Sequence, residues 1–338
     1  MLTAEQTSGI SVFVGTFALP AIIFGSLSKV NLSAVNWHFW LSILLAKSIV
    51  FTAVIVVGGC ANRHEPIGIS ALYAIFVTQS NDFALGLPIL NALFEESHPE
   101  YPSYLFLLVP IQLAILNPIA LVLIEVSIPK EGPTSSIDVK NTVINHPKND
   151  TLEENTIYMK NDGSPSPKIN ENDTKTLKKI WSVLSGLLVN PVILTTFAGL
   201  FFGSVVFKGK PPIAIDKLVG TVGKTFGALA LFTLGMAMVG TLDSFKEGKK
   251  LIVPMMLVAI KTIILPVVSY GITLTLCDGM DQTNELAGFA FLVGTLPTAP
   301  TAYVFAKKYD IRPDMVAGAM VVCTIVSAPI IYVSGSKD

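Results

Sequence analysis

Long apolar runs separated by short polar segments make up most of the chain. Each run is about twenty residues long, the length that an α-helix needs to cross a bilayer. We expect nine membrane spans, at residues 9–27, 37–57, 69–94, 101–128, 180–207, 213–241, 251–276, 286–306 and 315–333. The runs lack the alternation of barrel strands, so all nine should be helical. The pattern predicts an all-α polytopic membrane protein.

Two of the nine spans are interrupted by polar residues and prolines. Residues 78–88 (TQSNDFALGLP) break the third span, and residues 294–301 (GTLPTAPT) break the eighth. Polar groups at mid-membrane depth are costly and are tolerated where the chain lines a cavity, as in the broken helices of secondary transporters. The alternative is a pair of kinked helices whose polar groups are satisfied internally. We expect the substrate-binding residues to be Gln79, Ser80, Asn81, Asp82, Pro88, Thr295, Pro297, Thr298, Pro300 and Thr301.

Different roles are expected within this set. The amides and hydroxyls would offer neutral donors and acceptors to a carboxylate or a hydroxyl, assisted by free backbone N–H groups at half-helix N-termini. The prolines would keep the helices broken. For the threonines, a hydrogen bond back to their own helix is an equal alternative.

Three ionisable residues are predicted at membrane depth, where an unpaired charge is costly. Lys47 and Asp82 are expected to face one interior cavity and to form an ion pair or relay a proton. Lys261 repeats Lys47 in the second half of the chain and is given the same role. The alternative for Lys47 is a position near a helix end, from which its ammonium would snorkel to the interface.

Residues 129–176 differ in composition from the rest, being rich in Lys, Asn, Asp, Glu, Ser, Thr and Pro. Such a segment cannot bury a core, so we expect a disordered linker. It divides the chain into an N-terminal repeat of four spans (1–128) and a C-terminal repeat of five (177–338). If the linker is cytoplasmic, the basic loop residues Arg63, Lys246, Lys249, Lys250, Lys307, Lys308 and Arg312 share its side, in agreement with the positive-inside rule.

The two halves contain matching segments. Residues 46–50 (AKSIV) match 260–264 (IKTII), residues 115–119 (ILNPI) match 325–330 (IVSAPI), and the two broken spans lie between these pairs. The halves would insert in opposite orientations, which predicts an inverted-topology repeat. The span at 180–207 has no partner in the first half, so we expect one further span upstream of Met1 in a complete protein.

Composition and motifs narrow the function. The 338 residues are 51% hydrophobic and 14% charged, with a net charge of −1, which is typical of a multi-span membrane protein. The four histidines and three cysteines show no metal-ligand spacing, and no catalytic, nucleotide-binding or nucleic-acid-binding motif is present. We therefore expect no enzyme activity, metal or cofactor, and no nucleic-acid partner.

The chain resembles the PIN-like auxin efflux carrier family and, more closely, the transporter-like domain of lysosomal cholesterol-sensing proteins. The residues behind the resemblance are 17–21 (FALPA), 43–47 (ILLAK), 78–86 (TQSNDFALG), 116–119 (LNPI) and 326–334 (VSAPIIYVS). The resemblance implies two inverted five-helix repeats, in a PIN-like or bile-acid-symporter-like architecture, with a crossing of two broken helices at the site. It also implies a homodimer. The first helix of that pattern has no counterpart here.

These observations predict a PIN-type secondary transporter domain that moves or binds a small organic molecule, with anions among the candidates, by alternating access. The alternative is a non-transporting domain that senses a sterol or another lipid and signals from the lysosomal membrane. A third possibility is a scaffold that only dimerises. The protein would be integral to the lysosomal membrane, another endomembrane or the plasma membrane.

Overall fold

The computed structural model describes residues 4–30, 35–61, 67–94, 96–98, 101–127, 181, 185, 191–238, 251–280 and 282–335. The regular elements in these ranges are helices, joined by one isolated β-bridge. The linker expected at 129–176 lies outside the described residues.

The helices of the first half begin with α1 (Ala4–Phe13), a π-helical turn (Val14–Ala18) and α2 (Leu19–Leu27). They continue with α3 (Trp37–Ala61), α4 (Ile67–Thr78), a π-helical turn (Asp82–Gly86), α5 (Leu87–Phe94), α6 (Tyr101–Pro110), a π-helical turn (Ile111–Leu116) and α7 (Asn117–Ser127).

The helices of the second half are α9 (Pro191–Phe201) with a π-helical turn (Phe202–Val206), α10 (Ile213–Met238), α11 (Ile252–Ala259), a π-helical turn (Ile260–Ile264), α12 (Leu265–Leu276), α13 (Thr283–Thr295), α14 (Thr301–Lys308) and α15 (Pro313–Gly335).

Prolines account for most of the π-helical turns. Pro20, Pro88, Pro118 and Pro266 each lie two residues after the last residue of such a turn. A proline has no N–H and its ring excludes the carbonyl four residues earlier. That carbonyl lies inside the π-helical turn in all four cases, and the widened turn makes room for the ring without ending the helix.

Within the described ranges, five helical stretches are long and apolar enough to cross a membrane: Gly9–Leu27, Trp37–Ala61, Tyr104–Ser127, Ile252–Leu276 and Pro313–Gly335. These coincide with five of the nine predicted spans. The third and eighth predicted spans are each divided into two shorter helices, as their polar interruptions indicated. The helix α10 is not among the five, and residues 180, 182–184 and 186–190 of the preceding predicted span lie outside the described residues, so a total of nine stays a prediction.

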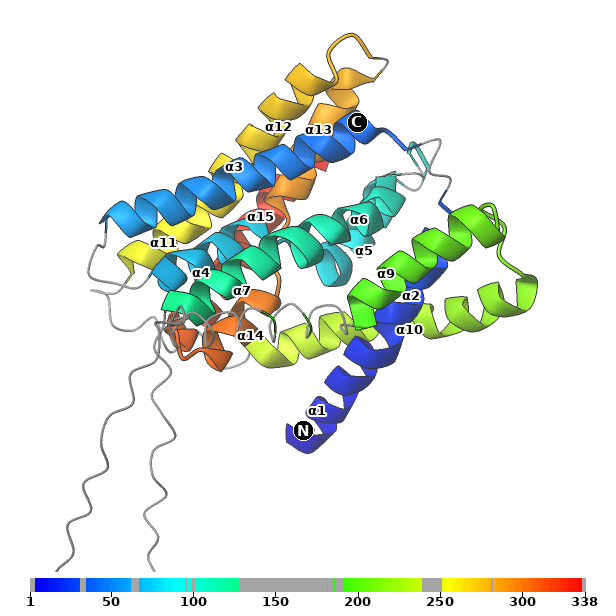
Figure 1. The fold of residues 1–338 in the computed structure, drawn as a ribbon, viewed down its shortest axis with the longest axis horizontal. Coiled ribbons are helices and arrows are strands. Elements are labelled where there is room, and N and C mark those ends of the chain that lie inside the picture. Colours follow the sequence, from blue (N-terminus) through cyan, green and yellow to red (C-terminus); the bar gives the residue numbers. More distant parts are fainter. Residues whose placement is uncertain are drawn as a thin grey trace, which may run out of the picture.

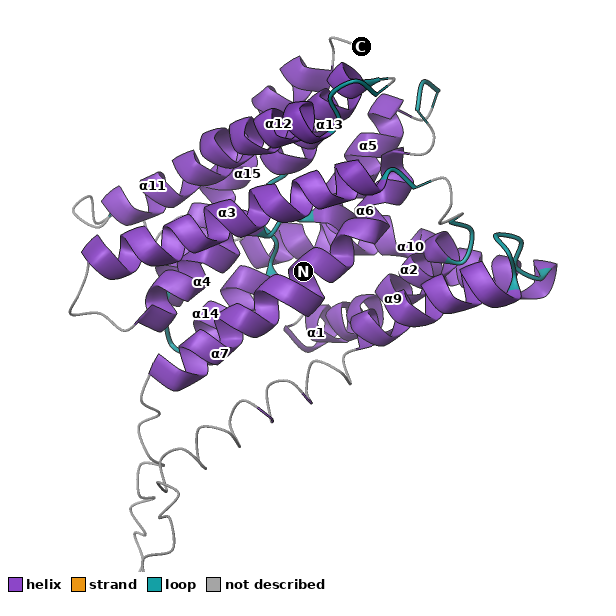
Figure 2. Cartoon of the chain, turned by 45° about the horizontal axis from the view of Figure 1, so that its top comes forward, coloured by secondary structure: helices purple, strands orange, loops and turns teal. Residues whose placement is uncertain are grey.

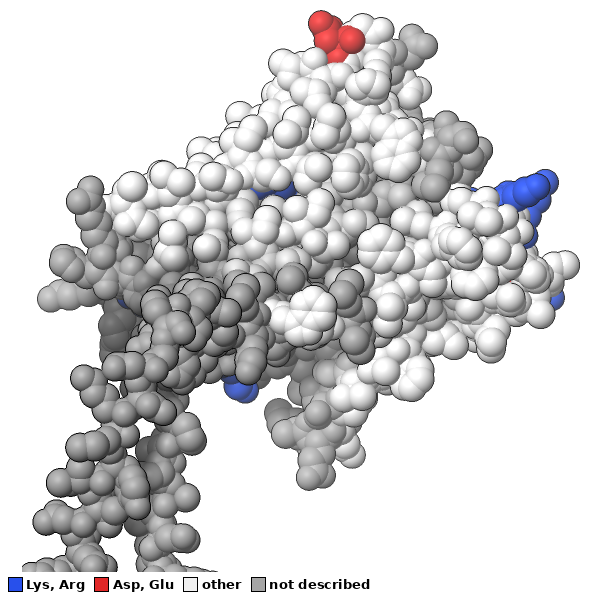
Figure 3. Space-filling view, in the orientation of Figure 1, with Lys and Arg blue, Asp and Glu red and all other residues white. Residues whose placement is uncertain are grey.

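The helices form two groups. Helices α1, α2, α9 and α10 lie together on one side, and most of the others pack into a larger group beside them (Figure 1). In the larger group, α3 runs beside the continuous stretch formed by α11 and α12, and α13 packs against α12 (Figures 1 and 2). The visible face is mostly uncharged, and its few charged side chains lie mainly near the margins (Figure 3), as expected of a surface in contact with lipid.

Candidate functional site

The two helix breaks meet in the interior and pair with each other. The Asn81 N–H donates to the Pro297 carbonyl (2.8 Å), and the Ala299 N–H donates to the Gln79 carbonyl (3.1 Å). Ser80 and Thr298 therefore face each other in a short antiparallel bridge. Both predicted breaks are confirmed as gaps between helices, and each break supplies backbone partners that the other has lost.

Side chains satisfy the helix ends beside the bridge. The Thr298 hydroxyl donates to the Phe76 carbonyl (2.9 Å), one of the last carbonyls of α4, which have no partner within their own helix. The Asn81 side chain accepts from the Ala84 N–H (3.2 Å) and caps the next helical segment. These bonds hold the breaks open without leaving these backbone groups unpaired.

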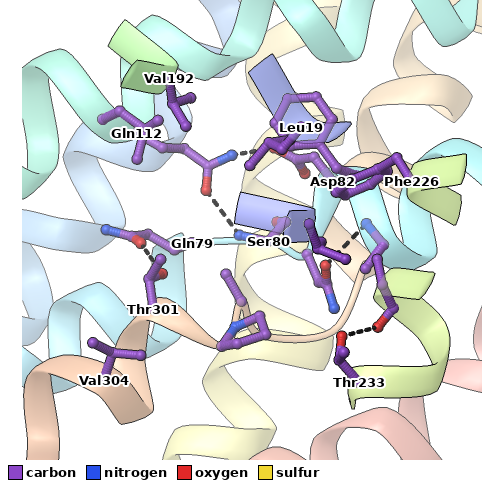
Figure 4. Close-up of a pocket in the computed structure, with 18 of the residues that line it drawn as sticks. Leu19, Gln79, Ser80, Asp82, Gln112, Val192, Phe226, Thr233, Thr301 and Val304 are labelled. Carbon is purple, nitrogen blue, oxygen red and sulfur yellow. Dashed lines mark hydrogen bonds between the residues drawn. The ribbon is translucent and has the colours of Figure 1, made fainter. Parts of the chain in front are cut away.

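A network of amides surrounds the first break. Gln112, on the π-helical turn after α6, accepts from the Ser80 N–H (3.0 Å) and donates to Asp82 Oδ2. Gln79 donates to Asn117 Oδ1 and accepts from the Thr301 hydroxyl (2.8 Å). Figure 4 shows Gln112 between Ser80 and Asp82, and Thr301 beside Gln79. Gln79 thus connects the first break to α7 and α14, and Gln112 connects it to the π-helical turn after α6.

Three charged side chains are buried near the breaks. Lys261 is fully buried, and its Nζ donates to Ser80 Oγ (2.8 Å). Lys47 is 1% exposed near the middle of α3, so it does not snorkel to a helix end. Within the described part of the chain, neither Lys47 Nζ nor Asp82 Oδ1 has a hydrogen-bond partner, and the two residues form no direct ion pair.

A cavity of about 440 Å³ lies between the breaks and the smaller group of helices. Its walls include Ser11, Val14 and Leu19 near the N-terminus, Val192 on α9, and Phe226, Ala230 and Thr233 on α10. The breaks contribute Gln79, Ser80, Asn81, Asp82, Ala299, Pro300 and Thr301. Leu19, Val192 and Phe226 form an apolar wall beside the polar groups of the first break (Figure 4).

Six of the ten predicted binding residues therefore line this cavity: Gln79, Ser80, Asn81, Asp82, Pro300 and Thr301. The other four have different positions. Pro88 lies in α5, and Pro297 and Thr298 are buried in the pairing of the breaks. The Thr295 hydroxyl donates back to the Phe291 carbonyl of its own helix (2.9 Å), which is the structural alternative for that residue. Lys47 and Lys261 do not line the cavity.

The sequence interpretation missed two parts of the site. Gln112 is an amide in an apolar run and follows Pro110 by two residues, a signal comparable to those that marked the two breaks. Phe226 lies in a helix whose many apolar residues look alike in sequence. Only the packing of α10 against α2 and the first break places Phe226 at the cavity.

Comparison with known proteins identifies the family. A family model described as "Membrane transport protein" matches residues 1–334. The chain belongs to the membrane transport protein family. This membrane transport protein is also 31% identical to the lysosomal cholesterol signaling protein of Mus musculus over 99% of the chain, and 25% identical to auxin efflux carrier component 8 of Arabidopsis thaliana over 97% of the chain.

These relatives differ in length. The chain covers 34% of the mouse protein and 88% of the Arabidopsis protein. The family and the apolar helices together make the chain an integral membrane protein of a transport family rather than of an enzyme family.

Proposed function

We propose that this membrane transport protein binds a small organic molecule in the cavity at the paired breaks and carries it across the membrane by alternating access. The observation that supports this most directly is the position of the cavity. One wall carries the polar groups of two unwound segments, and the opposite wall belongs to the separate group α1, α2, α9 and α10. Movement of one group against the other would open the cavity first to one side and then to the other.

The buried charges favour an anionic substrate. Lys47 and Lys261 are two buried cations near the breaks, and Asp82 is the one buried carboxylate there among the described residues. With all three ionised, the region has one excess positive charge, which the carboxylate of a substrate would balance. The amides and hydroxyls of Gln79, Asn81 and Thr301 would complete its hydrogen bonds.

Uptake by proteoliposomes tests this function. Radiolabelled indole-3-acetate and malonate serve as an aromatic and an aliphatic carboxylate, since one relative is named as an auxin carrier. Ala230→Trp fills the cavity from α10. Leu218→Trp is the matched control, because it adds the same ring to α10 at a residue that is 69% exposed. We expect Ala230→Trp to abolish uptake and Leu218→Trp to retain it. Equal uptake by both variants would contradict the proposal.

A second candidate function is sensing of a sterol or another lipid without transport. The match over 99% of the chain to a relative named as a lysosomal cholesterol signaling protein, of which the chain covers 34%, favours it. Cholesterol binding by a purified protein that transports no compound would support sensing over transport.

The architecture that we propose around the site is the one expected from the sequence. Two inverted repeats, at 1–128 and 177–338, are joined by a disordered cytoplasmic linker at 129–176. The protein forms a homodimer in the lysosomal membrane or in another membrane. The correspondence of Lys47 with Lys261, both buried and both beside a broken helix, supports the repeat. Thiol labelling of single cysteines placed at 30 and at 246 would test the orientation of the two halves, because the proposal places these positions on opposite sides.

A further inference from the structure

A second cavity, of about 430 Å³, shares no lining residue with the first. It runs between α3, α4, α11 and α12. Its lining is Ile49, Val50, Ala53, Val54, Val57, Gly58, Ala61, Ser70, Tyr73, Val253, Met256, Leu257, Ile260, Ile264 and Val268. We call it the α3–α11 groove.

The α3–α11 groove opens on a surface that faces lipid. Its walls belong to Trp37–Ala61 and Ile252–Leu276, two of the helical stretches suited to cross the membrane. Ile49, Val57 and Met256 on its rims are 52%, 62% and 54% exposed. The surroundings of this groove are therefore acyl chains, and an apolar occupant would enter sideways from the bilayer.

The length of the groove matches one leaflet. On α3 its lining extends from Ile49 to Ala61, which corresponds to about 18 Å at a rise of 1.5 Å per residue. Half of a hydrocarbon core is ~15 Å thick. The groove thus runs from near the bilayer centre to the membrane face at which α3 ends and α4 begins.

The polar groups of the groove lie toward that face. Ser70 and Tyr73 are the hydroxyl-bearing members of the lining and lie in the first two turns of α4. The exposed Arg312 donates from Nη1 to the Tyr73 hydroxyl (2.9 Å) and so places its guanidinium beside this end of the groove. Gly58 allows the close approach of α3 here, because a Cβ at this position would lie 2.5 Å from Ser70 Oγ.

We propose that the α3–α11 groove binds an anionic phospholipid, with one acyl chain between α3 and α11 and the phosphate at Arg312. The apolar length takes the chain, and the positive guanidinium, which donates one N–H to Tyr73, attracts the phosphate. This site is separate from the proposed transport cavity and does not depend on transport. Among the described residues, Arg312 is the cation placed at the polar end, and its charge favours an anionic headgroup over a neutral sterol hydroxyl.

Photocrosslinking in nanodiscs tests the proposal. The discs contain phosphatidylcholine and a trace of phosphatidylserine with a diazirine at the end of one acyl chain, and labelled peptides are identified by mass spectrometry. We expect label in residues 49–61 and 253–268. Ala53→Trp, which fills the groove from an exposed position on α3, should remove this label. Ile325→Trp, at a 62% exposed position on α15 outside the groove, should retain it.

The headgroup is tested separately. Arg312→Gln should reduce labelling about fivefold, the effect expected of one cation near the membrane surface. Excess unlabelled phosphatidylserine should compete in the wild-type protein, whereas phosphatidylcholine should not. Equal labelling by a phosphatidylcholine probe, unchanged labelling of Ala53→Trp, or displacement of the label by cholesterol would overturn the proposal.

Discussion

Two threonines three residues apart in the second break should differ in their contribution to the site. Thr295 and Thr298 are both buried, 0% and 3% exposed. The Thr295 hydroxyl bonds within its own helix, whereas the Thr298 hydroxyl reaches the Phe76 carbonyl at the end of α4. Replacement by valine keeps the shape of the side chain and removes the hydroxyl. Thr298→Val therefore removes the bond to the Phe76 carbonyl and a longer contact with Cys323 Sγ (3.7 Å), whereas Thr295→Val removes only a bond within one helix.

The expected magnitudes follow from the acceptors. Thr298→Val leaves a buried helix-terminal carbonyl without this donor, and an unsatisfied buried group costs ~1–3 kcal/mol. Hydrogen bonds between membrane helices average about 0.6 kcal/mol and reach ~1.7. We therefore expect Thr298→Val to lower stability by ~1–2 kcal/mol. The Phe291 carbonyl lies inside α13, where the helix supplies its partner, so Thr295→Val should cost less than ~0.5 kcal/mol.

The two variants would be compared with the wild type by thermal unfolding in nanodiscs and by uptake in proteoliposomes. A change of 1–2 kcal/mol in the population of the paired breaks corresponds to a factor of roughly 5–30. Uptake by Thr298→Val should fall within that range, while Thr295→Val remains near the wild type. Equal effects of the two substitutions would refute the assignment of the Thr298 hydroxyl as a bond that holds the breaks together.

Three further predictions concern residues around the site and at the edge of the membrane. Gln112→Leu should weaken substrate binding about tenfold or more, measured by scintillation proximity, because the buried Ser80 N–H loses its acceptor; unchanged affinity would argue against this role. Lys261→Met should fold, since no charge is left buried at that position, but should reduce uptake about tenfold through loss of the bond to Ser80; wild-type uptake would exclude this contribution. Burial and the neighbouring Glu125 raise the pKa of the Tyr309 hydroxyl, which donates to Glu125 (2.9 Å) in the α14–α15 connection. When folding raises the pKa of a tyrosine, it adds stability at pH values below the pKa of the unfolded chain, which is about 10. The wild type should therefore be ~1 kcal/mol more stable than Tyr309→Phe from about pH 6 to 9, and this difference should shrink above about pH 10. A difference in thermal stability that stays constant at every pH would contradict this reasoning.

Much of the fold could be predicted because the bilayer imposes length and polarity on each segment. The spans at 9–27, 37–57 and 315–333 needed only their apolar composition. The breaks at 78–88 and 294–301 could be predicted because polar residues and prolines are unfavourable inside a helix at membrane depth. The π-helical turns were not predicted, although their relation to a following proline, as at Pro266, is a local rule that the sequence contains.

The partners within the site could not be predicted in the same way. Lys261 and Ser80 are 181 residues apart, and their contact depends on how the two broken helices pass each other. The sequence predicted that Lys47 and Asp82 face one cavity as an ion pair or a proton relay. The described hydrogen bonds join Asp82 to Gln112 and Ser80 to Lys261. Residue type indicates that a buried polar group needs a partner, but long-range packing decides which partner it receives.

The central claim is that a substrate binds between the two paired breaks. The most direct measurement is a structure determined with the compound that gives the highest uptake in the proteoliposome panel. The account predicts ligand density in contact with Gln79, Asn81 and Thr301. Ser80 and Thr298 should remain paired in their β-bridge, even where the two breaks have moved together. Ligand density outside this cavity, or breaks that have wound into two continuous helices, would contradict it.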